Sequence, residues 1–129
     1  MASIEAFQEE GIVENAAATG DVLRTELNRL AAKHPSVGEV RGLGCFWGLE
    51  LVKNRDTREP LVPFNAAGEA NAPMVELIGA CKARGLWPFT HFNRMHVVPP
   101  LTISDDEVRQ GIAIIDEVLE LADKRYTGK

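Results

Sequence analysis

The sequence has little positive charge and no long apolar run. Its 14 lysine and arginine residues are outnumbered by 19 acidic residues, which gives a net charge of −5. A non-specific nucleic-acid binder needs a basic face, so no nucleic-acid partner is expected. No apolar run approaches the roughly 18 residues of a transmembrane helix, which excludes a membrane span. The N-terminus lacks the basic and apolar regions of a signal peptide, so a cytoplasmic location is expected.

The usual motifs of metal, nucleotide and nucleophile chemistry are also missing. Cys45 and Cys81 lie in apolar segments without a Cys-x-x-Cys neighbour, so two buried free thiols are expected ahead of a disulfide. The three histidines lack the spacing of a helical metal pair, and no metal site is predicted. Gly42 and Gly44 begin like a dinucleotide fingerprint, but Trp47 replaces the third glycine and a strand is expected to follow.

The first strong periodic signal predicts a helix over residues 12–33. Small and apolar residues recur there at steps of four and three, which places them on one helical face. These residues are Ala16, Gly20, Leu23, Leu27 and Leu30. Pro35 ends the helix, and His34 beside it is interpreted as a basic residue favoured near a helix C-terminus. A weaker helical turn is expected over residues 3–9, before Gly11.

The middle of the chain alternates between strands and a second helix. Residues 38–52 are expected to form one or two strands, and residues 53–68, which are charged and contain two prolines, a surface loop. A helix is predicted over residues 71–84, with Gly85 as its stop. Two further strands, 86–89 and 94–98, should be joined by the polar turn 90–93.

The last helix carries the clearest start signal. Ser104 and Glu107 form the pattern of a capping box, in which each side chain satisfies a free backbone amide. Apolar residues then follow at helical spacing: Val108, Ile112, Ile115, Leu119 and Ala122. The order of elements predicts an α+β fold, a single domain over residues 1–129, with helices packed on one face of a small, mostly antiparallel sheet.

Only one residue emerges as a candidate for binding, and none as catalytic. A lysine that forms a Schiff base normally stands in a desolvated pocket. All five lysines are instead expected to be solvated, since they lie at a helix end, in a polar loop, on the polar flank of a helix or in the C-terminal tail. Arg94 lies on a predicted strand edge among aromatic residues, where its guanidinium could hold a carboxylate by two hydrogen bonds. The alternative interpretation is an exposed strand arginine, or one that caps a backbone carbonyl.

Three segments are distinctive in order and spacing: residues 35–44 (PSVGEVRGLG), 46–60 (FWGLELVKNRDTREP) and 97–103 (VVPPLTI). Together with the final helix, they resemble the C-terminal small domain of class III pyridoxal-phosphate aminotransferases, which are enzymes of fold type I. The resemblance extends over nearly the whole chain. It implies an intact enzyme that binds pyridoxal phosphate (PLP), forms a homodimer and transfers an amino group between an amine or amino acid and a 2-oxo acid.

The resemblance also implies a division of labour within that enzyme. A large domain would carry PLP and its lysine, so no cofactor-binding residue and no bound PLP are expected in this chain alone, and residues 1–11 would form the connecting helix from that domain. Many members bind the substrate carboxylate with an arginine shortly before the Pro-Pro-Leu segment, which favours Arg94. In some members that arginine stands three residues before the first proline, where this chain has His96, and Arg94 stands five before.

Three hypotheses about function follow. The first is that the chain is part of a class III aminotransferase and is inactive alone because the Schiff-base lysine and the large domain are absent. The second is a stand-alone module, derived from that domain, that binds a small molecule or a partner. The third, an independent enzyme with other chemistry, has almost no support in the sequence.

Overall fold

The computed structural model describes residues 2–129 and confirms the predicted α+β fold. The helices are α1 (Ala2–Glu9), α2 (Ile12–Lys33), α3 (Ala72–Ala83) and α4 (Asp105–Asp123), with a 3-10 turn η1 (Gly68–Asn71) before α3. The strands are β1 (Val37–Leu43), β2 (Phe46–Asn54), β3 (Glu59–Pro60), β4 (Phe89–His91) and β5 (Arg94–Val97). None of the helices in this described part combines the length and apolarity that crossing a membrane requires.

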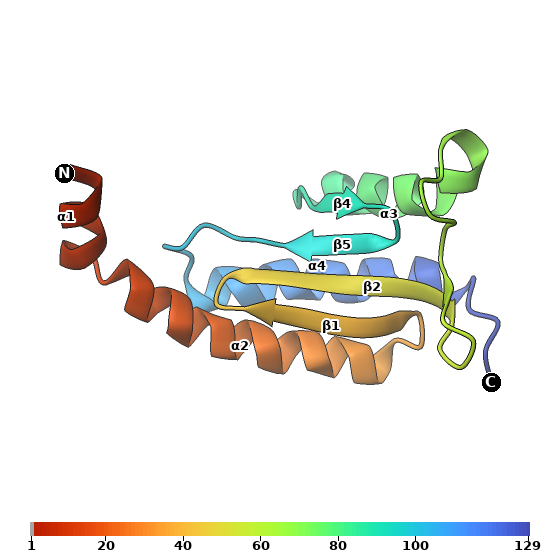
Figure 1. Cartoon of the computed structure of the whole chain (residues 1–129), viewed down its shortest axis with the longest axis horizontal. Coiled ribbons are helices and arrows are strands. Elements are labelled where there is room, and N and C mark those ends of the chain that lie inside the picture. Colours follow the sequence, from red (N-terminus) through yellow and green to blue (C-terminus); the bar gives the residue numbers. More distant parts are fainter. Residues whose placement is uncertain (1) are drawn as a thin grey trace.

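The sheet has the order β1-β2-β5-β4, with β3 added beside β2, and neighbouring strands are antiparallel throughout. Helix α4 lies behind the sheet and contacts both α2 and α3, while α1 stands apart at one end of the molecule (Figure 1). One face of the main sheet is therefore covered by helices, and the other face is open. This is the arrangement that the sequence predicted.

Strand β2 shows how the two faces arise. Its residues point alternately to opposite sides, so Trp47, Leu49 and Leu51 are buried against the helices. Gly48 and Glu50, between them, point to the open face. The predicted apolar stripes of the helices complete the core, which includes Leu23, Leu27 and Leu30 of α2, Met74, Leu77 and Cys81 of α3, and Val108, Ile112, Ile115 and Leu119 of α4.

Two predictions from the middle of the chain need correction. The strand expected over residues 86–89 lies further along the chain, as β4 at Phe89–His91. The amide of Leu86 ends helix α3 by donating to the carbonyl of Cys81, so it does not pair with a strand. Pro88 has no amide hydrogen to donate to a neighbouring strand. Residues 53–68 are not wholly a surface loop, since they contain β3 and bury Leu61 and Val62 in the core. The two cysteines are buried and free, as expected.

The turn between β1 and β2 is fixed by contact with α2. Gly44 has a φ of 55°, in the left-handed region that glycine adopts most readily. A Cβ atom on Gly20 of α2 would lie 2.7 Å from the Cα and 2.9 Å from the carbonyl oxygen of Gly44. Two backbones therefore meet here with no room for a side chain, which positions the β1–β2 hairpin on the helix.

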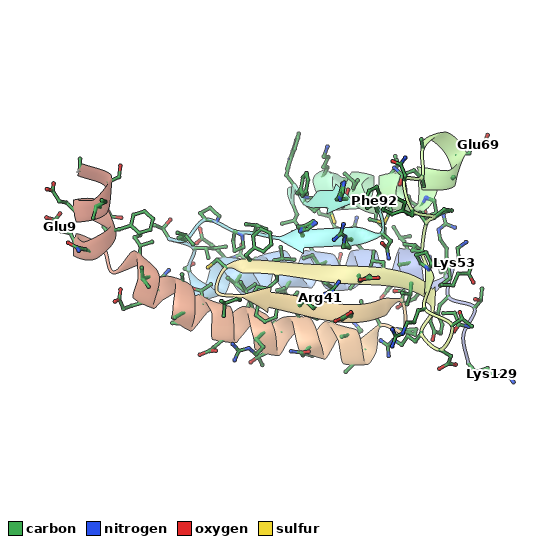
Figure 2. The ribbon with its side chains drawn as sticks, in the orientation of Figure 1. Glu9, Arg41, Lys53, Glu69, Phe92 and Lys129 are labelled. Carbon is green, nitrogen blue, oxygen red and sulfur yellow. The ribbon has the colours of Figure 1, made fainter. Side chains whose placement is uncertain are left out.

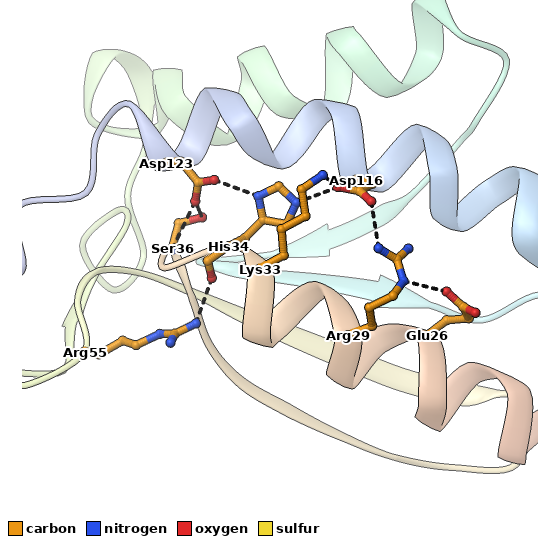
Figure 3. A network of polar contacts seen from close by, with 8 residues as sticks. All are labelled: Glu26, Arg29, Lys33, His34, Ser36, Arg55, Asp116 and Asp123. Carbon is orange, nitrogen blue, oxygen red and sulfur yellow. Dashed lines mark hydrogen bonds and ion pairs between the residues drawn. The ribbon is translucent and has the colours of Figure 1, made fainter.

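A polar network connects the C-terminal end of α2 to α4 (Figure 3). His34 is only 1% exposed, and its Nδ1 and Nε2 atoms lie 2.6 Å and 2.8 Å from carboxylate oxygens of Asp123 and Asp116 respectively. Asp116 also pairs with Lys33 and Arg29. Burial opposes its ionisation, but hydrogen bonds from Lys33, His34 and Arg29 outweigh this and hold the pKa of Asp116 well below its usual range.

The other members of this network close the connection from α2 to β1. The hydroxyl of Ser36 donates to Asp123 at 2.6 Å, and the guanidinium of Arg55 donates to the carbonyl oxygens of His34 and Val37. The same guanidinium donates to the carbonyl of Ala31 in the last turn of α2, so free carbonyls at the end of the helix are satisfied. The dipole interpretation of His34 was thus incomplete, because its main partners are two carboxylates from a helix more than 80 residues away in sequence. The capping box predicted at Ser104 and Glu107 is confirmed.

The contact between Gly20 and Gly44 can be tested by substitution. Gly20→Ala should lower the free energy of unfolding by about 1–3 kcal/mol, because the backbones must separate to admit a methyl group. Gly79→Ala is the matched control, since Gly79 is also helical but has nothing within 4 Å of its Cβ position; it should raise stability by about 0.5–1 kcal/mol. Urea unfolding curves would measure both, and equal effects of the two substitutions would contradict the contact.

The network makes a second prediction about stability. His34→Ala should cost about 3 kcal/mol, because it leaves Asp116 and Asp123 with a missing partner at a buried position. Lys33→Ala removes a neighbouring partner of the same Asp116, but the Lys33 side chain is 53% exposed, so the loss should stay under about 1 kcal/mol. Chemical unfolding at pH 7 distinguishes the two. Similar losses would show that His34 does not have the central role assigned to it.

Candidate functional site

The open face of the sheet contains a hollow of about 230 Å³. Six residues line it: Arg41, Phe46, Gly48, Glu50, Arg94 and His96. They come from β1, β2 and β5, the strands seen from their uncovered side in Figure 2. Arg94, the residue singled out in the sequence, is thus part of a concave and charged surface. An adjoining hollow shares Arg41 and Glu50 and extends to Arg55 and Arg58.

Strand register explains why these residues meet. Glu50 on β2 is directly opposite Arg94 on β5, and Gly48 is opposite His96. On the other side of β2, Gly48 is opposite Arg41 of β1. Residues that face each other in a ladder point to the same side of a sheet. Gly48, which has no side chain, leaves the floor of the hollow low between Arg41 and His96.

Within the described part of the chain, Arg94 is a cation without an anionic partner. It is half-buried, and among residues 2–129 it makes no ion pair. One of its guanidinium nitrogens lies 3.2 Å from Nδ1 of His91, and the guanidinium carbon is 5.8 Å from the centre of the Phe92 ring. His91 and Phe92 therefore orient the guanidinium of Arg94 without neutralising its charge. An arginine in this state can bind a carboxylate or another acid group with two parallel hydrogen bonds.

His96 gives the hollow a second polar group of different character. Its ring lies 6.1 Å from that of Phe46 and 5.3 Å from that of Phe89, measured between centroids. Burial, followed by the charges of Arg94 and His91, lowers the pKa of His96 below its ordinary value. The lowered pKa favours the neutral imidazole at pH 7, which can exchange a hydrogen bond with a ligand without adding charge.

The five lysines do not provide a site for the coenzyme that the resemblance implies. Lys33 pairs with Asp116, Lys53 lies 3.8 Å from Glu59, and Lys82 lies over the ring of Trp87. Lys124 and Lys129 follow α4 and are exposed. A lysine that forms a Schiff base with PLP needs a desolvated position, and none of these five is buried. The five lysines therefore do not fit the role of the lysine that anchors PLP.

The geometry of residues 2–129 does not support a metal site or a hydrolytic triad. In the part of the chain from residue 2 onward, there is no group of three or more His, Cys, Asp or Glu side chains that could hold a metal ion. Ser36, His34 and Asp123 are the residue types of a hydrolytic triad, but the carboxylate binds both of the others in place of a serine–histidine contact (Figure 3). Ser36 is also fully buried. This cluster is structural.

The chain matches known proteins over nearly all of its length. The family model described as "Aminotransferase class-III" matches residues 1–119. The taurine–pyruvate aminotransferase of Bilophila wadsworthia is 37% identical over 98% of this chain and 26% of its own length. The 4-aminobutyrate aminotransferase of Escherichia coli is 30% identical over 92% of this chain and 26% of its own length.

Solved structures agree with this match. A taurine:2-oxoglutarate aminotransferase from Bifidobacterium kashiwanohense, in complex with PLP and glutamate, superposes with a TM-score of 0.87 at 25% identity, over 95% of this chain and 27% of that one. A Bacillus anthracis aminotransferase gives a TM-score of 0.79 at 29% identity, over 90% of this chain and 26% of that one. The chain thus spans about a quarter of the length of the proteins it matches.

Proposed function

The chain belongs to the class III aminotransferase family, and on that premise we propose that its 129 residues form one domain, the C-terminal small domain of a PLP-dependent enzyme. The intact enzyme transfers an amino group between an amine or amino acid and a 2-oxo acid, and it works as a cytoplasmic homodimer. The proposal is supported by the family match and by the chain's coverage of about a quarter of its relatives.

Helix α1 and the glycine after it support the proposed role of residues 1–11 as a connector. None of the residues of α1 is buried, and the helix projects from the end of the molecule (Figure 1). Gly11 has a φ of 58°, so the chain changes direction before α2 begins. A helix with no packed face of its own gains its stability from contacts elsewhere. In the proposed enzyme, those contacts come from the large domain.

The coenzyme belongs to the intact enzyme and not to this chain. PLP, when bound, serves as the electron sink for amino transfer, and the lysine that anchors it lies outside the lysines described above. The contribution of this chain is to shape one wall of the substrate site. We place that wall at the hollow on the open face of the sheet.

Arg94 is proposed to bind the acid group of the substrate. The support is its half-buried guanidinium with no carboxylate partner in the described part of the chain, set in a concave surface. The substrates in the names of two relatives are taurine, a sulfonate, and 4-aminobutyrate, a carboxylate. Both are acid groups that a planar guanidinium can bind with two hydrogen bonds. His96 is placed to add a neutral hydrogen bond from the same strand face.

The location of the coenzyme lysine can be tested on the 129-residue chain. Incubation with PLP followed by borohydride should label the five exposed or half-buried lysines weakly and without preference, because none stands in a desolvated pocket. Peptide mass spectrometry would measure the labelling of each lysine. An unfolded sample provides the control for intrinsic reactivity. Preferential labelling of a single lysine in the folded chain would contradict the proposed division between this domain and the rest of the enzyme.

The role of Arg94 can be tested by ligand titration. Arg94→Gln should weaken binding of taurine or 4-aminobutyrate about tenfold, because a charge-assisted hydrogen bond contributes about 1.5 kcal/mol. Arg109→Gln on α4 removes the same charge from a position outside the hollow, where the arginine donates to a backbone carbonyl, so binding should not change. Amide chemical shifts in NMR spectra would follow the titrations. If Arg94→Gln binds these ligands with the same affinity as the unsubstituted chain, Arg94 does not bind the acid group.

The same titration separates the two hypotheses that the sequence left open. A weak affinity is expected if the hollow is only one wall of a larger substrate site. Tight, Arg94-dependent binding by the isolated chain would instead favour a stand-alone binding module. The unpaired guanidinium is common to both hypotheses, so affinity is the property that distinguishes them.

A further inference from the structure

Glu50 is the nearest acidic residue to Arg94 in the strand register, yet the two are not paired. They are direct cross-strand partners on β2 and β5, and opposite charges at such positions usually attract each other across a ladder. Among the ion pairs of residues 2–129, Glu50 instead appears with Arg41. The guanidinium of Arg94 faces His91 and Phe92.

Arg41 reaches Glu50 diagonally from β1. Its own cross-strand partner is Gly48, which has no side chain and leaves the path to Glu50 clear. An Nη2 atom of Arg41 donates to Oε2 of Glu50 at 2.9 Å, and its Nε lies 3.5 Å from Oε1 of Glu39. Diagonal neighbours in an antiparallel pair are within reach of long side chains. Arg41 therefore occupies the carboxylate that would otherwise be available to Arg94.

We propose that Arg41 is a positioning residue, which holds the carboxylate of Glu50 away from Arg94 and so keeps Arg94 free for the acid group of a ligand. The inference rests on the proposed function of Arg94. With Arg41 and Glu50 paired, the hollow presents one uncompensated positive charge. Without Arg41, Glu50 turns to its direct partner, and the Glu50–Arg94 pair competes with the ligand.

A simple loss of positive charge must be distinguished from this role. If Arg41 acted only through its charge, Arg41→Gln would weaken binding equally whether or not position 50 carries a carboxylate. If Arg41 acts by occupying Glu50, its removal matters only while Glu50 is present. The two mechanisms therefore predict different results when the substitutions are combined, as in a double-mutant cycle.

The test is a titration of the 129-residue chain with taurine, and separately with 4-aminobutyrate, followed by NMR. Arg41→Gln should weaken binding about threefold, because an exposed ion pair has a modest effect. In the Glu50→Gln background the same substitution should change the affinity by less than about 1.5-fold. Arg58→Gln is the matched control, because it removes one positive charge from the adjoining hollow and leaves the Arg41–Glu50 pair intact. Its affinity should equal that of the unsubstituted chain.

A second readout follows the side chain of Arg94 directly. In Arg41→Gln, the guanidinium should move from His91 toward Glu50, which would shift the Arg94 Nε–H and the His91 ring signals in the absence of ligand. Neither signal should shift in the variant that also carries Glu50→Gln. Unfolding curves would establish that each variant remains folded, as expected for substitutions on an exposed face.

The possible failures are distinguishable. If Arg41→Gln weakens binding equally in both backgrounds, or has no effect, while Arg94→Gln still weakens binding about tenfold, the positioning role of Arg41 is wrong and the proposed role of Arg94 stands. If Arg94→Gln binds as the unsubstituted chain does, the proposed role of Arg94 fails and the inference fails with it.

Discussion

The alternation of strand β2 between a buried and an open face is the constraint on which the rest of the structure depends. Trp47, Leu49 and Leu51 pack against the helices. Gly48 and Glu50, which alternate with them, line the hollow on the open face, where Gly48 forms the floor and Glu50 supplies a negative charge. Because side chains alternate along a strand, burying Trp47, Leu49 and Leu51 on one face necessarily directs Gly48 and Glu50 to the other. The hydrophobic core therefore sets which charged side chains reach the site, and the antiparallel partners of β2 supply the remaining ones from both sides.

Local patterns in the sequence predicted most of this architecture. The spacing of Leu23, Leu27 and Leu30 located α2, and the Ser104–Glu107 box located the start of α4. The sequence also indicates Arg94, because an arginine among aromatic residues at a strand edge is chemically distinctive. The structure adds that it lies in a hollow without a carboxylate partner in the described chain, while its role in binding stays a prediction.

The remaining features depend on contacts between distant parts of the chain, which periodicity cannot reveal. His34 meets two carboxylates that lie more than 80 residues further along, and the pairing of Arg41 with Glu50 depends on the exact register of β1 against β2. The displacement of β4 was hidden for another reason. The predicted strand begins at Leu86, but the amide of Leu86 donates to the carbonyl of Cys81 and ends α3.

The close approach of Gly20 and Gly44 affects how this region can vary over evolutionary time. Because the tip of the β1–β2 hairpin rests on α2 without an intervening side chain, its strands have little freedom to lengthen, shorten or slide. Amino-acid replacements on the open face do not disturb that anchor, whereas an inserted or deleted residue would exchange the two faces of β2. Ligand preference can thus change through amino-acid substitutions on the open face, while the length of the β1–β2 hairpin and the helices packed behind it stay the same.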